Sequence, residues 1–388
     1  MIVPITKKMQ PIKISILGGY MCGKTSLIAS VFDQMLNGEL NKIFTVADRT
    51  MQENKVSPIH GKEECKTLLI NKRMELIRFI EKGDNNTFIV DQAPTMNSRE
   101  YNMQIQISGT TKVFGMDFMD IPGSFMQQTS HYSDGIVEEI VEESDVYVVV
   151  IDTPFMMEGS RAENSLANCI DQIHCLLVSG CDGIKAKQVI FVPLKCEKWV
   201  QEVNGYDKVV RKVEEVYSST IKELKVRQTE ISIIPIQTAG GIVFDSLKPA
   251  YRVVNDNDEI VVDKCSILND GNIIDRNGNL HKLQLNEFVI ESGYKYYRTN
   301  IDIPIAWYRL KNDAQYRPYN CEQLPLHILR FMFNKFMKET PGGFFGDLGS
   351  FLFGSITVND MQECLNELSK ANLIKDNVEG IKTIKKCF

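Results

Sequence analysis

Eight residues near the start of the sequence combine glycines, a lysine and a threonine at a spacing that suits phosphate binding. The run is Gly18-Gly19-Tyr20-Met21-Cys22-Gly23-Lys24-Thr25, with Ser26 directly after it. It matches G-x-x-x-x-G-K-[ST] at every fixed position. Glycines let the backbone curl so that its N–H groups face an anion. Lys24 then reaches the β- and γ-phosphates of a nucleotide, Thr25 binds Mg²⁺ through its hydroxyl, and Ser26 adds a hydrogen bond to the α-phosphate.

Such a loop needs a strand before it and a helix after it, and the sequence predicts both. Residues 12–17 are an apolar run typical of a buried strand. After the loop, apolar residues recur at helical spacing: Leu27, Ile28, Val31, Phe32, Met35 and Leu36. A strand, a glycine loop and a helix in this order favour a phosphate-binding loop over a glycine turn formed by chance.

A second motif, Asp120-Ile121-Pro122-Gly123, follows a predicted strand about a hundred residues later. A carboxylate at this place holds Mg²⁺, usually through water, and the N–H of Gly123 contacts the γ-phosphate. The pattern D-x-x-G alone also fits an ordinary turn. Its position at the end of a strand, after the glycine loop, favours the metal site.

The rest of the chain predicts an α/β fold of the P-loop NTPase type, with a doubly wound and mostly parallel sheet. Buried strands are expected at 146–152, 188–193 and 231–236, and they alternate with helices at 132–143, 162–178 and 207–226. A hairpin of strands at 100–107 and 112–119 adds one antiparallel edge. A helix at 61–82 forms an insertion, Asn/Asp/Gly-rich residues at 264–288 predict a β-meander, and 321–338 is the last helix of the sheet domain.

These elements suggest domain bounds. Residues 10–244 and 321–340 form the nucleotide-binding domain, with a helical insertion at 37–94. Residues 245–320 form a β-rich insertion, and 341–388 form a C-terminal helical extension with one helix at 361–371. Residues 341–353 are apolar enough for a lipid or partner contact, but packing against the core is favoured because large exposed apolar patches are rare.

Composition excludes several classes of protein. The chain has 388 residues, of which 43% are hydrophobic and 24% charged, so it can bury a core. A net charge of −6 argues against a broad nucleic-acid or anionic-membrane surface. Its ten cysteines include no C-x-x-C pair and its five histidines no metal spacing. With no signal peptide and no apolar run long enough to span a bilayer, we expect a cytoplasmic protein with reduced thiols.

In this order, the motifs resemble the TRAFAC class of P-loop GTPases, the group that includes the small GTPases. The resemblance implies a switch threonine before the hairpin that leads into D-x-x-G. Thr95 holds that place and would ligate Mg²⁺ and contact the γ-phosphate, with Thr50 and Thr87 as substitutes. The alternative is an ordinary exposed loop threonine.

The family recognises its base with [NT]-K-x-D after a strand, and this chain has Leu194-Lys195-Cys196-Glu197. The resemblance implies that Lys195 lies along the base and that Glu197 accepts from guanine N1–H and the 2-amino group. Leu194 lacks the family's polar side chain, so guanine specificity is less secure than nucleotide binding, and a solvated charged loop is the alternative. Thr238-Ala239-Gly240 matches the family's last signature, which contacts the base through backbone amides.

Many small GTPases place a glutamine directly after D-x-x-G to orient the attacking water, and here that residue is Ser124. Gln127 is the candidate for this role, with Gln128 and His131 nearby, and Arg99 is the best placed arginine. The resemblance therefore implies a Mg²⁺-dependent switch that binds GTP and GDP and hydrolyses GTP slowly, stimulated by a protein partner or by self-association. The alternatives are an ATPase or kinase on the same scaffold, and a nucleotide-binding scaffold that hardly hydrolyses.

A narrower resemblance is to bacterial GTPases of the double-GTPase and conflict-system type. It rests on the D-I-P-G motif, the altered base motif and a Cys-Glu-Gln-x-Pro-Leu segment at residues 321–326.

Overall fold

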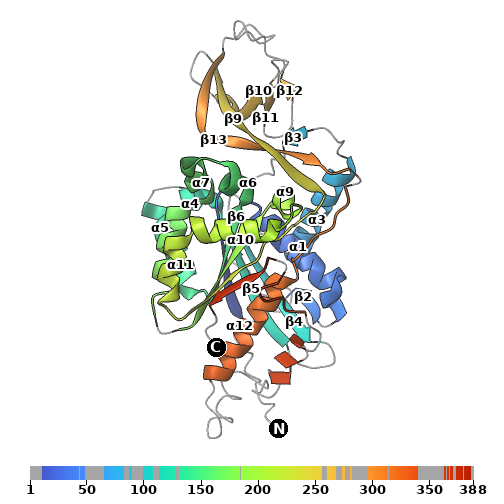
Figure 1. The fold of residues 1–388 in the computed structure, drawn as a ribbon, viewed down its shortest axis with the longest axis vertical. Helices are drawn as coiled ribbons and strands as arrows, with labels where there is room; N and C mark the ends of the chain where they lie inside the picture. Colours follow the sequence, from blue (N-terminus) through green and yellow to red (C-terminus); the bar gives the residue numbers. More distant parts are fainter. Residues whose placement is uncertain are drawn as a thin grey trace, which may run out of the picture.

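The computed structural model shows an α/β molecule with a second sheet above the first (Figure 1). The residues that it describes are 11–42, 44–48, 65–82, 87–89, 99–107, 113–127, 131–183, 185–255, 260–267, 273–275, 280–281, 296–312, 314–339, 362–363, 365–366, 368–369, 373–378 and 380–385.

The main sheet has eight strands in the order β14-β8-β7-β6-β1-β5-β4-β2. Five of them pair in parallel: β1 (Ile12–Leu17), β5 (Val113–Asp120), β6 (Val146–Asp152), β7 (Lys187–Leu194) and β8 (Thr229–Ile233). β4 (Arg99–Ile107) and β2 (Phe44–Asp48) continue beyond β5 as antiparallel strands. The predicted mostly parallel sheet with an antiparallel edge is therefore confirmed.

Helices cover both faces of this sheet, as the alternation of its buried strands requires. Val146, Val148 and Val150 of β6 pack into one hydrophobic core, whereas Tyr147, Val149 and Ile151 pack into the other. The first core includes helices α1 (Lys24–Asn37), α3 (Cys65–Lys82) and α12 (Gln323–Glu339). The second includes α5 (His131–Glu143), α8 (Ile170–Gly180), α10 (Gly205–Val216) and α11 (Ser218–Lys225). None of the described helices is both long and apolar enough to cross a membrane.

Two segments that were each predicted to form one helix form two consecutive helices. The helix expected at 162–178 is α7 (Arg161–Asn168) and α8, which meet at Cys169, a left-handed residue with φ 48°. The helix expected at 207–226 is α10 and α11, which meet at Tyr217. Three shorter helices follow the strand ends: α4 (Gly123–Gln127), α6 (Thr153–Glu158) and α9 (Glu197–Val200), and η1 (Glu39–Lys42) follows α1.

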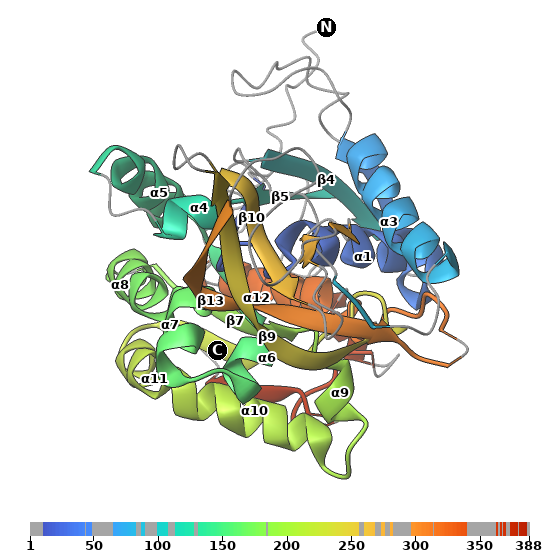
Figure 2. The same ribbon diagram turned by 90° about the horizontal axis from the view of Figure 1, so that it is seen from above.

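A second sheet of six strands has the order β12-β11-β10-β9-β13-β3. Its strands are β9 (Ile242–Asn255), β10 (Ile260–Ile267), β11 (Ile273–Asp275), β12 (Leu280–His281), β13 (Tyr296–Leu310) and β3 (Thr87–Ile89). Seen from above, β9 and β13 cross over the end of the main sheet (Figure 2). The β insertion before the last helix is confirmed. The insertion at 37–94, expected to be helical, also contains two strands that were not predicted: β2, which pairs with β4, and β3, which pairs with β13. The domain bounds remain predictions.

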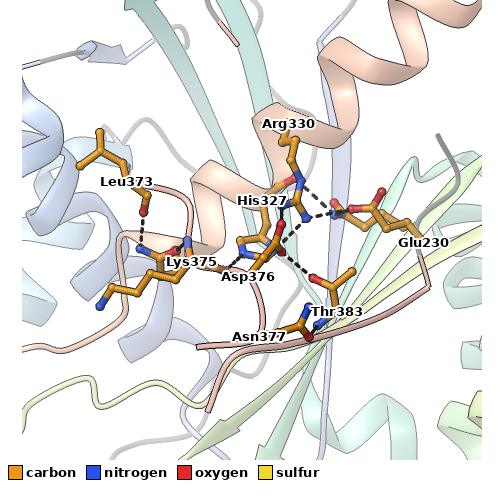
Figure 3. A network of polar contacts seen from close by, with 10 residues as sticks. Glu230, His327, Arg330, Leu373, Lys375, Asp376, Asn377 and Thr383 are labelled. Atoms are coloured by element: carbon orange, nitrogen blue, oxygen red, sulfur yellow. Dashed lines mark hydrogen bonds and ion pairs between the residues drawn. The ribbon is translucent and has the colours of Figure 1, made fainter. Parts of the chain in front are cut away.

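The C-terminal segment is joined to α12 and β8 by a buried polar network (Figure 3). Arg330 pairs with Asp376 at 2.6 Å and with Glu230 at 3.4 Å, and Thr383 donates to Asp376 at 2.6 Å. The ring nitrogen Nε2 of His327 lies 3.1 Å from the carbonyl oxygen of Lys375. Burial raises the pKa of the Glu230 carboxyl, although Arg330 opposes the shift.

The extension that the sequence predicts to be helical also contains a strand. β14 (Lys382–Lys385) forms one edge of the main sheet and pairs antiparallel with β8. The described residues among 362–369 are helical, which agrees with the helix expected there. Residues 341–353 lie outside the described residues.

Candidate functional site

The glycine loop connects the end of β1 to α1, which begins at Lys24. Gly23 has φ 103°, a left-handed conformation that glycine adopts without strain, and this turn starts the helix. The Lys24 ammonium donates to the carbonyl oxygens of Gly18 at 2.9 Å and Gly19 at 2.8 Å. The loop therefore wraps around a buried positive charge at the amino end of a helix, an arrangement that suits an anion.

The variable positions of the loop are packed rather than solvent-exposed. Cys22 is fully buried, and its sulfur lies 3.9 Å from Lys24 Nζ. Burial raises the pKa of the Cys22 thiol, so this residue contributes packing and not charge. Tyr20 is half-buried, and Met21 has φ 61°. Ser26, on the first turn of α1, is buried as well.

Two of the three predicted metal ligands, Thr25 and Asp120, meet. Thr25 donates from Oγ1 to Oδ2 of Asp120 at 2.7 Å. Asp120 is fully buried, and its Oδ1 has no hydrogen-bond partner among the described residues. Burial raises the pKa of Asp120, while Lys24, Thr25 and Arg99 oppose the rise. Arg99 lies directly opposite Asp120 in the pairing of β4 with β5.

This donor set fits Mg²⁺. A hydroxyl and a carboxylate with an unpartnered oxygen are hard oxygen ligands, and Mg²⁺ takes only one or two such ligands from the protein when phosphates and water supply the rest. Within the described residues, no group of three or more His, Cys, Asp and Glu could hold a metal ion. A cage made wholly of such side chains is therefore absent from that part of the chain.

Gly123 brings the D-x-x-G motif against the phosphate loop. A Cβ at Gly123 would lie 2.4 Å from both the N and the Cα of Tyr20, so only glycine allows this approach. Gly123 begins α4, Ser124 follows half-buried, and the backbone of Gln127 ends the helix. Thr95, Thr50 and Gln128 lie outside the described residues, as does the side chain of Gln127, so their predicted roles stay predictions.

The base motif contacts the phosphate loop through Lys195. This residue follows β7 with φ 57°, and its ammonium donates to Oδ2 of Asp152 at 2.6 Å and to the Met21 carbonyl at 3.1 Å. The ammonium also lies 5.6 Å from the centre of the Tyr308 ring. Burial would lower the pKa of Lys195, but Asp152, Tyr308 and Cys22 together outweigh it and the pKa is raised.

Sequence reasoning missed both Asp152 and Tyr308. Asp152 had a usable signal, because it is a carboxylate at the end of a buried strand. Tyr308 had none, since its role depends on how the second sheet is placed.

Glu197 begins α9 and is buried beside the Thr-Ala-Gly loop. Burial raises the pKa of its carboxyl to about 7, and hydrogen bonding from the backbone of Glu197 and Gly240 opposes the rise. The preceding Leu194 is buried, and its Cδ1 lies 3.2 Å from where a Cβ of Gly23 would stand. An apolar side chain therefore packs on the glycine loop at the place where the resemblance to GTPases implies a polar one.

The Thr238-Ala239-Gly240 loop is held from two sides. The hydroxyl of Ser30 in α1 donates to the Thr238 carbonyl at 2.8 Å. The backbone N–H of Arg317 donates to the Ala239 carbonyl at 2.9 Å, on a segment that runs back from β13. The structure thus brings the phosphate loop, D-x-x-G, Lys195, Glu197 and this loop to the carboxyl ends of the parallel strands.

No protein-family model and no curated protein matches the chain. Among solved structures, the chain is similar to the GTPase-like domain of S. cerevisiae Ski7 bound to GDP and inorganic phosphate, with 10% identity, a TM-score of 0.33, and coverage of 79% of this chain and 76% of that chain. For the same domain bound to GTP, the identity is 11%, the TM-score is 0.34, and the match covers 80% of this chain and 72% of that chain. For Sup35 complexed with GDP, the identity is 10%, the TM-score is 0.27, and the match covers 81% of this chain and 67% of that chain. The fold assignment rests on the strand order of the chain itself.

Proposed function

We propose that this chain binds guanine nucleotides at the loop of residues 18–26 and hydrolyses GTP to GDP and phosphate with Mg²⁺. The observation that carries the proposal is the hydrogen bond of 2.7 Å between Thr25 and Asp120. It joins two motifs that are 95 residues apart in the sequence, next to the buried ammonium of Lys24. A cation ligand pair beside a lysine and a glycine loop is the arrangement that a nucleoside triphosphate requires.

Each part has a role in this proposal. The loop amides of residues 18–23, Lys24 and Ser26 bind the phosphates, and Gly123 contacts the γ-phosphate. Thr25 and Asp120 hold Mg²⁺, with Thr95 as a further predicted ligand, and the bound ion neutralises charge on the phosphates. Lys195 lies along the base and Glu197 accepts its N–H groups, while the loop at 238–240 presents backbone amides.

Hydrolysis is proposed to be slow and to depend on a partner. Ser124 stands where many relatives have a glutamine, so Gln127 is the candidate that orients water. Arg99 is exposed on β4 opposite Asp120, and it is the candidate arginine within the chain. An arginine supplied by an activator or by a second copy would accelerate turnover by about 10³ to 10⁵. Such a protein acts as a nucleotide-dependent switch.

An ATPase on the same scaffold is the second candidate. Leu194 packs as an apolar side chain on the phosphate loop, and Glu197 is folded onto Gly240 with a pKa of about 7, so the motif for guanine is altered in two places. A nucleotide-binding scaffold with little hydrolysis is favoured by Ser124 and by the bulk of Tyr20 next to Gly123.

The test is competition of GTP, GDP, ATP and ADP against a fluorescent guanine nucleotide with Mg²⁺. Lys24→Ala should abolish tight binding, because the charge at the loop is lost. Lys13→Ala is the matched control, since Lys13 lies on the same strand β1 but is exposed and pairs with Glu143. A preference for GTP and GDP that is lost only in Lys24→Ala supports the proposal. Equal or better competition by ATP favours the ATPase, and full binding by Lys24→Ala contradicts the loop assignment.

Turnover measurements then separate the switch from the scaffold. Phosphate release that is slow alone and faster with a partner, or at higher protein concentration, fits the switch. Release that stays negligible under all these conditions fits the scaffold.

A further inference from the structure

Lys195 has an uncommon backbone conformation, and its side chain contacts three other residues. Its φ of 57° is left-handed, which a residue with a side chain adopts only where its surroundings impose it. An ammonium has three N–H donors. One faces Asp152 at 2.6 Å and one faces the Met21 carbonyl at 3.1 Å, and the ammonium also lies over the Tyr308 ring at 5.6 Å.

Tyr308 is the one of these partners that belongs to the six-stranded sheet. It lies on β13 and is buried, with 3% of its surface exposed. A cation over the face of a buried aromatic ring is attracted by the ring's electrons, and the attraction is larger where water is excluded. The sheet therefore contributes directly to where the Lys195 side chain sits.

The same sheet also packs on the helix that carries Glu197. Tyr308 contacts Phe244 of β9 edge to face, with ring centres 6.0 Å apart. Phe244 in turn stacks on Trp199 of α9 at 5.4 Å. An aromatic row thus runs from Lys195 to the short helix that begins at Glu197, so Lys195 and this helix both contact the six-stranded sheet.

We propose that Tyr308 is a positioning residue for the base end of the nucleotide site: its ring holds Lys195 so that the lysine stem lies along the base. The inference rests on the proposed function, and it goes beyond it by making the six-stranded sheet a part of the base-binding site. Docking of that sheet and binding of the base are then coupled, whereas the phosphates are bound by residues of the main sheet domain alone.

The test compares two ligands of the full chain, Mg²⁺–GDP and Mg²⁺–tripolyphosphate, because only the first has a base. Tyr308→Leu and Tyr308→Met remove the ring, and either folded variant suffices. Affinity for GDP should fall about tenfold while affinity for tripolyphosphate stays the same. Tyr308→Phe keeps the ring and should recover most of the loss. In a Lys195→Met background, removing the ring should have no further effect.

Tyr147→Leu is the matched control. The Tyr147 ring of β6 lies 5.7 Å from the Lys187 ammonium at the start of β7, so the same kind of pair occurs at the opposite end of the strand that Lys195 follows. This variant loses stability but should keep the ratio of the two affinities.

The outcomes are distinct. Equal losses for both ligands, no loss of GDP affinity, or a loss that Tyr308→Phe does not recover would each overturn the positioning role while leaving the proposed function standing. A wild-type protein that binds tripolyphosphate but no nucleotide would overturn the proposed function and this inference with it.

Discussion

At the scale of residues, the site depends on two buried carboxylates in different surroundings. Asp120 lies beside Lys24 and Thr25, whereas Glu197 rests on the backbone at Gly240. Burial raises the pKa of both carboxyls because it disfavours the charged form. In the proposed function both must be ionised, Asp120 to hold Mg²⁺ and Glu197 to accept the guanine N–H groups. The bound ligand then offsets the cost of charge in a buried place.

Affinity for GDP is therefore expected to rise with pH through about 7. Burial raises the pKa of Glu197 from 4.5 to about 7, and only the ionised carboxylate accepts both guanine N–H groups. Below that pKa the affinity should fall by up to about tenfold per pH unit. Titrations of GDP between about pH 6 and pH 8 measure the effect, with Glu197→Gln as control because the nucleotide phosphates titrate equally in both proteins. An identical pH profile for the two proteins would rule out this role of Glu197.

The ligand-free protein should show the opposite trend. Between pH 4.5 and about 7 the folded state keeps the Glu197 proton that the unfolded chain releases. Stability contributed by this group is therefore present at low pH and falls as pH rises across that window. Unfolding of the wild type and of Glu197→Gln should be measured across this pH range. The difference between their free energies of unfolding gives the contribution of Glu197.

At the scale of elements, the candidate site lies at the carboxyl ends of the parallel strands, whereas the C-terminal segment stabilises one lateral edge of the main sheet. β14 pairs with β8, which without it would be the edge strand and would present unpaired backbone groups. The same segment supplies Asp376 to Arg330, whose side chain is 11% exposed. The C-terminal segment thus binds to the main sheet domain both through backbone hydrogen bonds to β8 and through the ion pair of Asp376 with Arg330.

Asp376→Asn should lower the free energy of unfolding by about 1–3 kcal/mol, because it leaves a buried guanidinium with a weaker partner. Urea unfolding of the ligand-free protein measures this. Glu214→Gln is the control, since Glu214 pairs with Lys382 of the same segment at a site where the lysine is 42% exposed. That exposed pair should contribute about 0–1 kcal/mol. If the two variants lost equal free energy of unfolding, burial of the Arg330 network would contribute no extra stability.

At the scale of the whole molecule, the six-stranded sheet stands over the carboxyl ends of the main sheet (Figure 1). The segment that follows β13 borders the Thr-Ala-Gly loop: the Lys311 N–H donates to the Gly241 carbonyl, and Gln237 pairs with Tyr319. β14, by contrast, lies on the outer edge of the main sheet. Ligand binding at the carboxyl ends is therefore expected to change the local stability of β13 and not that of β14.

Hydrogen exchange should report this asymmetry. Adding Mg²⁺–GDP should slow amide exchange in β13 and in residues 311–319, because binding suppresses their local opening, and should leave β14 at its ligand-free rate. Exchange followed by mass spectrometry with and without nucleotide tests it, with Lys24→Ala as the protein that does not respond. Equal protection of β13 and β14 would show that nucleotide acts on global stability alone.

Local patterns were enough to predict the parallel sheet and the helix after the glycine loop, because each of these has its signal within a few neighbouring residues. The same patterns selected the candidate site residues, whose roles stay predictions. The breaks at Cys169 and Tyr217 were missed because the apolar period continues through both. The short strands β2, β3 and β14 were missed because three to five residues have no clear period of their own, and their pairing partners are distant in the sequence.

By itself, the sequence determined that a glycine loop with the pattern G-x-x-x-x-G-K-[ST] follows a buried strand and that a carboxylate, a lysine and a glutamate follow later strands. Only the tertiary structure decided that Thr25 meets Asp120, that Asp152 and Tyr308 hold Lys195, and that Glu197 lies against Gly240. The physical reason is that a motif is local, whereas hydrogen bonds and burial depend on which strand ends the sheet order places side by side.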